Sequence, residues 1–322
     1  MQRLGFTSVC RSTLSDANHV RPLGILEETY GKLLVRAHQL APKSTGFRFK
    51  GGVQALDGTT IDLCLSLSPW ANYRKGKGAV KLHTAIDIAG DLPDFVVITP
   101  GKRNEIPIAR QYFHPKPGTT VLIDRGYWDS QWLSDLNDQD VHFVTRQRRN
   151  NRFKVVESRP TDRTRGHICD QIVYQKKAKG KAPVPVYRGK LRRISYIDPA
   201  TSKKLMFITN RFDLATQTIC DLYKARWKVE LFFKTLKQNL RVKKFLGNSA
   251  HAVRAQILIA LIAYLLVQII RFSQKTTISM PDAMAVIATL LLLREPLSRL
   301  FGELPRTTRH SRDSPTQLVM LF

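Results

Sequence analysis

The segment Tyr223–Lys237 restricts the fold most, because its side chains separate into a polar stripe and an apolar face at helical spacing. At ~100° per residue, four polar side chains fall within an arc of about 60°, namely Tyr223, Arg226, Glu230 and Lys237. The neighbouring face is apolar and consists of Leu222, Val229, Phe232, Phe233, Leu236 and Leu240. The pattern predicts one helix that packs against a core and holds the Glu230 carboxylate at the edge of its buried face.

Glu230 has two interpretations at this stage. In the simpler one, Arg226 and Lys234 lie one turn before and after it on an exposed helix and form ordinary ion pairs, each worth a few tenths of a kcal/mol. In the other, Glu230 is a functional carboxylate that works with acids from elsewhere in the chain. The second interpretation requires further acids at positions where a fold would bring them together.

Two upstream aspartates have such settings. Asp57 lies in a segment of alternating apolar residues, Gly52–Leu63, which reads as a strand. Asp124 ends the apolar run Thr120–Ile123 and precedes Gly126, where the backbone must turn. An aspartate at the carboxyl end of a buried strand is where open α/β sheets bind ligands. Taken alone, either residue is more often a turn or cap aspartate.

Together these three blocks resemble a known family. The spacing of Tyr223, Arg226, Glu230 and Lys237 is the YREK pattern of a group of bacterial insertion-sequence transposases. The stretches Asp-Gly-Thr-Thr at Asp57 and Asp-Arg-Gly-Tyr at Asp124 resemble the other two blocks of that group. The chain therefore resembles the IS-four family of DDE transposases, from about residue 11 to the long helices near residue 270.

The resemblance implies a DNA transposase that cleaves and joins the ends of its own insertion sequence by metal-dependent phosphoryl transfer. Asp57, Asp124 and Glu230 would be the catalytic residues and would hold two Mg²⁺ or Mn²⁺ ions. Hard cations prefer such carboxylates, and a pair of them activates the nucleophile and stabilises the leaving oxygen. Asp57 would bridge both ions, with Asp124 holding one and Glu230 the other.

The family also implies DNA contacts. Tyr223, Arg226 and Lys237, with Lys234 nearby, would bind the phosphates of the element ends, although a rim hydrogen bond and surface ion pairs are the alternative. Some members flip a base onto an aromatic side chain, and Trp128 would be that platform. Its alternative is the core, because Trp128 shares helical spacing with other aromatic residues.

The charge of the chain points to a polyanionic partner. Its 322 residues contain 52 Lys and Arg against 25 Asp and Glu, a net charge of +27. Nucleic acid and an anionic membrane surface are the two candidates. Residues 146–193 contribute +13 of this charge, since they contain 16 bases and three acids. We expect a basic β-rich insertion that binds DNA backbone through Arg148, Arg149, Arg192 and Arg193; a solvated charged loop is the alternative.

The order of elements predicts an α/β fold. Strands are expected at 52–63, 79–88, 94–99, 120–123 and 141–145, with helices at 106–112 and 130–136. This is the order of a ribonuclease-H-like mixed sheet with flanking helices, in which the first and fourth strands pair and bring Asp57 close to Asp124. Within the insertion, 167–174 and 184–187 look like further strands. A helical C-terminal part follows.

The expected domains follow these shifts in pattern. Residues 1–45 would be the remnant of an N-terminal helical region that binds element ends. Residues 46–145 and 207–275 would form the two parts of the catalytic domain, with the insertion at 146–206 between them. Residues 276–322 would form a C-terminal helix and basic tail.

The longest apolar run, Ile257–Ile270, has 14 residues, and a membrane span needs about 20. We predict a fully buried helix there and another at Ala283–Leu293, separated by Pro281, and no membrane partner. Met1–Ser12 lacks the apolar core of a signal peptide, which favours a cytoplasmic, nucleoid-associated protein. The resemblance implies double-stranded DNA, both terminal inverted repeats and target, and a homodimer in the DNA complex.

Two rival functions remain compatible with the sequence. One is a ribonuclease-H-like nuclease that cleaves DNA without strand transfer. The other is a truncated, DNA-binding inhibitor of transposition, because very little chain precedes the block that begins near Arg11.

Overall fold

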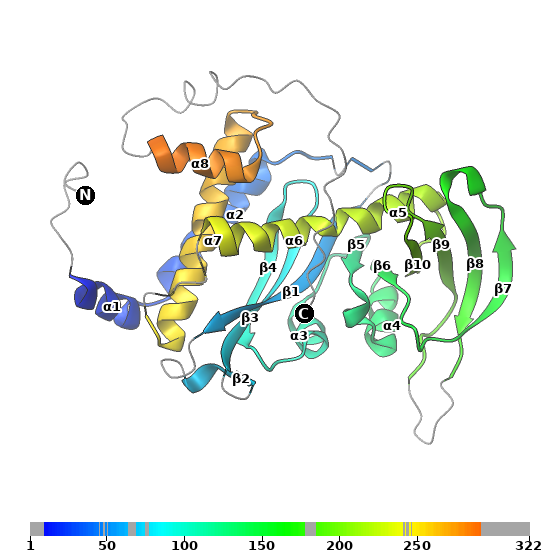
Figure 1. Cartoon of the computed structure of the whole chain (residues 1–322), viewed down its shortest axis with the longest axis horizontal. Coiled ribbons are helices and arrows are strands. Elements are labelled where there is room, and N and C mark those ends of the chain that lie inside the picture. The colour runs from blue at the N-terminus through cyan, green and yellow to red at the C-terminus, as the bar shows by residue number, and fades with distance from the viewer. Residues whose placement is uncertain are drawn as a thin grey trace.

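The computed structural model describes residues 10–290, apart from residues 45, 48, 50, 64–68, 75–76, 178–184, 241, 243, 244 and 246. Its centre is a mixed sheet of ten strands, in the order β2-β3-β1-β5-β6-β10-β9-β8-β7 with β4 paired to β3 (Figure 1). The strands are β1 (Val53–Leu63), β2 (Asn72–Arg74), β3 (Lys77–Asp87), β4 (Leu92–Pro100), β5 (Thr120–Ile123), β6 (His142–Arg146), β7 (Phe153–Arg159), β8 (His167–Gln175), β9 (Leu191–Ile197) and β10 (Lys204–Thr209).

The central strands confirm the predicted topology. β1 pairs antiparallel with β3 and parallel with β5, and β5 pairs parallel with β6. The first and fourth strands of the expected order are therefore neighbours. β5 is short and buried along its whole length, as its uninterrupted apolar sequence predicts.

Helices cover both faces of this sheet. They are α1 (Arg11–Val20), α2 (Gly24–Leu40), α3 (Glu105–Tyr112), α4 (Ser130–Asp138), α5 (Thr216–Ala225), α6 (Trp227–Lys234), α7 (Ala250–Ser273) and α8 (Met280–Leu290). One core cluster joins β1 and β5 to α3 and α4, and contains Leu56, Ala109, Ile123 and Leu133. The other joins the same strands to α5, α6 and α7, and contains Ala55, Leu122, Leu222, Val229 and Ile257. Successive residues of β1 thus enter different cores, as the two-residue period of a strand requires.

The basic segment is rich in strands that extend the central sheet. β10 pairs with β6 and then with β9, and β8 and β7 follow as antiparallel strands (Figure 1). The predicted strand at 167–174 is β8. Residue 184 lies outside the described residues, and Pro185–Tyr187 do not form a strand. The expected domain limit at residue 206 falls inside β10.

The predicted helix over Tyr223–Lys237 is helical throughout, but it is not one regular α-helix. The α-helix ends at Ala225 and resumes at Trp227, and the bonds Arg226 N–H to Tyr223 O and Val229 N–H to Arg226 O each span three residues, tighter than an α-helix. A π-helical turn over Thr235–Asn239 then follows α6. Because a π turn adds backbone to each turn, Lys237 does not keep the angular position that regular α-helical spacing assigns to it.

The long apolar helix also differs from the expectation. α7 is not fully buried, because Ile259 is 47% exposed and Leu266 is 46% exposed. By length and composition α7 could cross a membrane, yet half of its most apolar stretch is buried inside the protein. Pro281 lies in the first turn of α8 and does not end a helix, since its missing N–H costs nothing there. The break between α7 and α8 spans residues 274–279.

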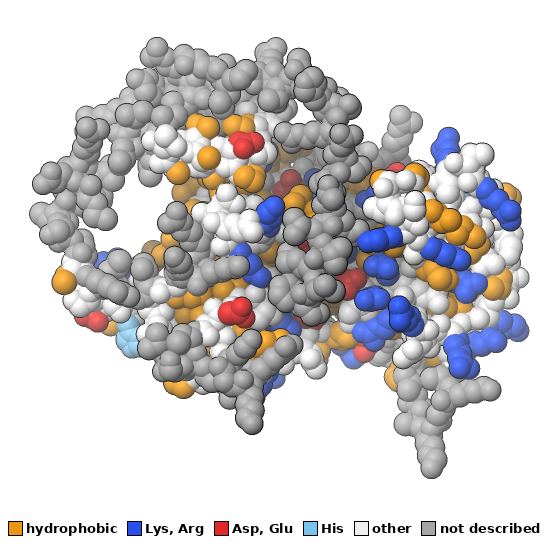
Figure 2. Space-filling model, in the orientation of Figure 1, with side chains coloured by type: hydrophobic (Ala, Val, Ile, Leu, Met, Phe, Trp, Pro, Cys, Tyr) orange, Lys and Arg blue, Asp and Glu red, His pale blue; other side chains and the backbone are white. Residues whose placement is uncertain are grey.

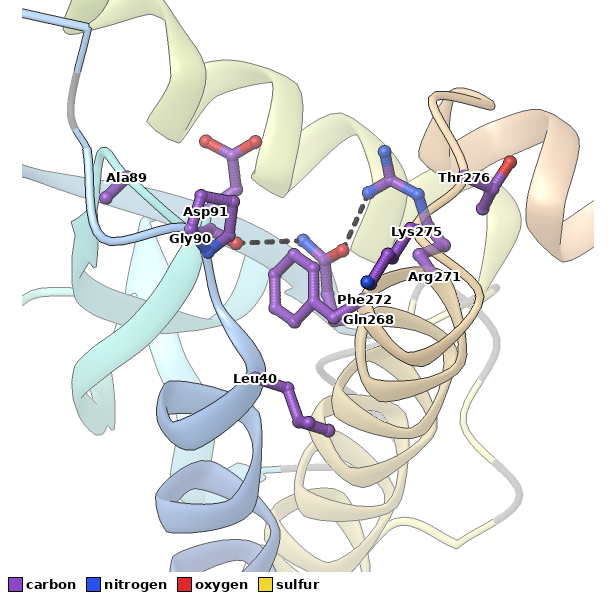
Figure 3. A pocket seen from close by; sticks show the side chains of 10 residues that line it. Leu40, Ala89, Gly90, Asp91, Gln268, Arg271, Phe272, Lys275 and Thr276 are labelled. Carbon is purple, nitrogen blue, oxygen red and sulfur yellow. Dashed lines mark hydrogen bonds between the residues drawn. The ribbon is translucent and has the colours of Figure 1, made fainter.

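A cavity of about 380 Å³ lies where α2, the β3–β4 turn and α7 meet (Figure 3). Gln268 donates to the carbonyl of Gly90 at 3.2 Å and accepts from Arg271 at 2.6 Å. These polar groups fix α7 against the turn. None of the predicted site residues lines this cavity.

The assignment of Arg192 to DNA binding is wrong. Its side chain and that of Asp170 are each 2% exposed and form an ion pair across β8 and β9. Arg192 also donates to the carbonyls of Arg211 and Leu214. A charge taken out of water needs such partners, so Arg192 joins the insertion to the start of α5 and faces no DNA.

Removing one partner of this buried pair should destabilise the protein. Asp170→Ala leaves the Arg192 guanidinium without its carboxylate and should lower the free energy of unfolding by about 3–5 kcal/mol. Urea denaturation followed by tryptophan fluorescence measures the change. The control is Arg193→Ala, because Arg193 lies next to Arg192 on β9 and is partly exposed. Its free energy of unfolding should fall by less than about 1 kcal/mol. Equal losses would show that the pair does not hold the insertion.

Candidate active site

The pairing of β1 with β5 places the two aspartates side by side. The last paired residues of the two strands are Leu56 and Ile123, and Asp57 and Asp124 come directly after them. Adjacent paired strands lie about 4.8 Å apart, so the backbones of the two aspartates start from neighbouring positions. Asp57 also accepts a hydrogen bond from the N–H of Gly58 at 2.8 Å.

Arg226 joins two of the predicted acids. Its guanidinium lies 3.5 Å from Asp57 Oδ2 through one terminal nitrogen and 2.6 Å from Glu230 Oε1 through the other. The Arg226 side chain is 13% exposed, so little water separates these charges. The break in the helix before Trp227 leaves Arg226 between α5 and α6, where it reaches across to β1.

Tyr223 completes the connection to Asp124. Its hydroxyl donates to Asp124 Oδ1 at 3.4 Å, and its ring lies 5.5 Å from the carbon of the Arg226 guanidinium. Tyr223 is 8% exposed and packs on Phe207 of β10. Asp57, Asp124, Tyr223, Arg226 and Glu230 therefore meet at one place in the fold.

The electrostatics of Asp57 follow from its surroundings. The pKa of Asp57 is raised to about 7, chiefly by burial; Arg226 and the N–H of Gly58 oppose this rise, and the carboxylates of Glu105 and Glu230 add to it. Burial also raises the pKa of Tyr223 to about 12. A cation placed beside Asp57 would therefore stabilise its ionised form.

Glu105, which was not among the predicted site residues, lies at the same place. It is the first residue of α3 and bonds with Lys81 of β3, its Oε1 being 3.3 Å from the ammonium. The predicted helix began one residue later, at 106. An acid in the first turn of a helix that follows a core strand was the available signal.

The chemistry of the cluster suits a hard divalent cation, because its ligating atoms are carboxylate oxygens. Among the described residues, however, no three His, Cys, Asp or Glu side chains are arranged to hold a metal ion as they stand. The guanidinium of Arg226 occupies the position of a cation between Asp57 and Glu230. The residues therefore fit a metal once Arg226 releases one of its two carboxylates.

The assignment of Trp128 as a base-stacking platform is wrong. Trp128 is 5% exposed, its ring meets Phe153 edge-on at 6.1 Å, and its indole N–H donates to Ser130. The core alternative therefore holds. Trp227, which directly follows Arg226 in the chain, is 50% exposed.

The remaining predicted DNA contacts have different surroundings. Lys234 is exposed at the end of α6, and Lys237 is partly exposed in the π-helical turn. Arg148 donates to the carbonyls of Arg125 and Gly126, both at 2.7 Å, and so supports the turn after Asp124. Arg149 is exposed, and Arg193 is partly buried against Gln171.

Residues 48–266 match the family described as "Transposase DDE domain". The chain is 30% identical over 314 residues to a protein of Sinorhizobium fredii named as transposase y4zB, covering 96% of this chain and 85% of the relative. It is 28% identical over 267 residues to a protein of Geobacillus stearothermophilus named as the transposase of insertion sequence element IS5377, covering 80% and 66%. Among solved structures, a piggyBac transposase synaptic complex with hairpin DNA is similar at a TM-score of 0.42 and 13% identity, over 88% of this chain and 63% of that one.

Removing Arg226 should expose the repulsion between the acids. We expect Arg226→Met to lower the melting temperature in EDTA by about 4 °C or more, the shift for a loss of about 1–2 kcal/mol in a chain of this size. Adding Mg²⁺ should raise the melting temperature of Arg226→Met by more than it raises that of the parent protein. Differential scanning fluorimetry with and without Mg²⁺ measures both effects.

Lys228→Met is the matched control for that experiment. It removes a charge two residues further along the chain, but Lys228 binds Asp91 and the carbonyl of Ile88, away from the acids. A loss in Arg226→Met that Mg²⁺ does not reduce would contradict the bridging role.

Proposed function

The chain belongs to the family of transposases with a DDE domain, and from this premise we propose that Asp57, Asp124 and Glu230 are its three catalytic carboxylates. The protein is a DNA transposase, an enzyme that cleaves DNA and joins strands, and dependence on divalent metal ions comes with the family. The observation that supports the residue assignment is the Arg226 guanidinium, which lies between Asp57 and Glu230 beside the Tyr223–Asp124 pair.

The three carboxylates would hold two Mg²⁺ or Mn²⁺ ions. When bound, such ions activate the attacking oxygen and stabilise the leaving oxygen in a displacement at phosphorus. Asp124 follows a rigid buried strand and Glu230 lies on a packed helix, so both carboxylates approach Asp57 from fixed backbone positions. Rigid support of this kind keeps the reacting groups in line.

Arg226 would change partners when DNA enters. In the structure it neutralises Asp57 and Glu230. Once cations take over that role, its planar donors become available to bind a phosphate next to the cleaved bond. Tyr223, Lys234 and Lys237 would add contacts to the same strand. We further assign the chain to the IS-four group on the YREK spacing, acting on the inverted repeats of its own element.

The basic insertion would hold the flanking DNA. Figure 2 shows Lys and Arg side chains gathered over the part of the surface formed by β7–β10. The exposed bases among the described residues of this part are Arg149, Arg152, Lys154, Arg163, Arg165, Lys176, Lys177, Arg188, Lys190, Lys203 and Lys204. Arg188 is already bound to Asp135 and Asp138. The proposed backbone contacts therefore begin with Arg148 and Arg149 and continue along β7 with Arg152 and Lys154, with Arg193 beside them.

The assembly and location follow from the same proposal. Two element ends must be brought together before they can be joined to one target, so we propose a homodimer in the DNA complex. Chromosomal DNA as the substrate implies a cytoplasmic, nucleoid-associated protein.

The carboxylates can be tested by substitution with their amides. Asp57→Asn, Asp124→Asn and Glu230→Gln each keep the side-chain shape and remove a charge that a cation needs. Cleavage of element-end DNA in Mg²⁺ should fall by about 10³-fold or more in each variant. DNA binding in EDTA should hold or become tighter, because the net positive charge increases.

Glu157→Gln, an exposed acid on β7, is the control for these variants and should cleave like the parent. If Glu230→Gln cleaves and joins at close to the parent rate, Glu230 is an ion-pair partner of Arg226 and nothing more. Cleavage by the parent without joined product would favour the nuclease, and DNA binding without any cleavage would favour the inhibitor.

The insertion can be tested through the salt dependence of binding. Each phosphate contact adds a little under one unit, about 0.9, to the slope of log affinity against log salt. Replacing Arg149, Arg152 and Lys154 by Ala should therefore reduce the slope by up to about three units. Fluorescence anisotropy with labelled element-end DNA at several KCl concentrations measures it.

The control is an equal loss of charge outside both the insertion and residues 1–45, made at Lys116, Arg254 and Lys275, which are exposed. An unchanged slope in the insertion variant would assign its charges to solvent.

A further inference from the structure

We propose that Glu105 is a fourth carboxylate of the cation site and binds a divalent cation together with Asp57 and Asp124, an inference that rests on the proposed function of those two aspartates. Glu105 and Glu230 come from opposite faces of the sheet. α3, which carries Glu105, packs in the core cluster with Leu56, whereas α6, which carries Glu230, packs in the cluster with Ala55. Asp57, in the strand between them, would be shared by both sides.

The glycines beside the two aspartates leave room for Glu105. A Cβ atom at Gly58 would lie 3.1 Å from Glu105 Oε1 and 3.2 Å from Glu105 Cγ, closer than nearly all such contacts. A Cβ atom at Gly126 would lie 3.9 Å from Glu105 Oε2 and also 3.9 Å from Asp124 Oδ2. One oxygen of Glu105 therefore faces the Asp57 strand, and the other faces the turn that follows Asp124.

Tyr127 supplies an independent sign of a ligand. Its side chain is 1% exposed, and its hydroxyl has no hydrogen-bond partner among the residues that the structure describes. Burial raises the pKa of Tyr127, and the carboxylates of Asp57, Glu105 and Asp124 raise it further, so the hydroxyl lies within electrostatic reach of all three. A buried hydroxyl without a partner costs about 1–3 kcal/mol. A water molecule or phosphate oxygen on a bound cation would give it that partner.

Lys81 and Arg226 explain how the cluster persists without metal. Lys81 Nζ lies 3.3 Å from Glu105 Oε1, with a side chain that is 14% exposed. Arg226 neutralises Asp57 and Glu230 in the same way from the other face. Carboxylates this close repel one another unless cations lie between them. A divalent cation would replace these two internal bases and draw Glu105 and Asp124 toward one ion.

Manganese binding to the full chain without DNA tests the proposal directly. Electron paramagnetic resonance of free Mn²⁺ gives both the number of sites and their affinity. We expect Glu105→Gln to weaken the tighter site by about 10-fold or more and Glu105→Asp to weaken it less, because a shorter carboxylate remains. Gly58→Ala, whose new methyl group would press on the Glu105 carboxylate, should weaken it while every acid is still present. Glu157→Gln should bind Mn²⁺ like the parent.

The outcomes separate this proposal from the one it rests on. If Asp57→Asn loses Mn²⁺ but Glu105→Gln and Gly58→Ala bind it like the parent, Glu105 is only an ion-pair partner of Lys81 and the catalytic assignment stands. If Asp57→Asn also binds Mn²⁺ like the parent, the proposed metal site itself is wrong. If Glu105→Gln does not fold, Glu105→Asp and Gly58→Ala decide the question by the same measurement.

Discussion

The parallel pairing of β1 with β5 is the constraint on which the site depends. It brings together residues far apart in the sequence, and it ends at Leu56 and Ile123, immediately before Asp57 and Asp124. A shift of one residue in this register would turn Asp57 toward the other face of the sheet. The register is fixed from both sides, because Leu56 and Ile123 pack under α3 and α4 while Ala55 and Leu122 pack under α5 and α6. The two hydrophobic cores therefore determine where the acids meet.

The clustered carboxylates then require positive charge in their surroundings. Four carboxylates converge where burial raises the pKa of Asp57 to about 7, and positive charge beside such a group stabilises its ionised form. The fold supplies that charge from side chains with little exposure, Arg226 and Lys81. A site that carries its own cations can fold before metal or DNA arrives. It can exchange those cations later for metal ions and phosphates, because ion pairs of this kind are made and broken without moving the backbone.

Sequence patterns predicted the strands and their order well, since alternation and short apolar runs depend on local burial. They failed where tertiary contacts decide. Regular helical spacing could not show the break at Arg226 or the π turn at Thr235–Asn239, which redirect side chains within one helical stretch. Composition could not distinguish buried Arg192 from partly exposed Arg193, because only the partner Asp170 across the sheet separates them. Glu105 was missed for the same reason: its neighbours Gly58, Lys81 and Gly126 come from three other segments.

The insertion supports the active site as well as carrying charge. Arg148, at its start, binds the carbonyls of Arg125 and Gly126 in the turn after Asp124. Trp128 of the same turn packs on Phe153 of β7, and Ser130 donates to Gln175 of β8. The turn that carries Asp124 is thus held by contacts from the first two strands of the insertion. The segment that we propose to bind the DNA backbone is therefore in direct contact with the turn that carries Asp124.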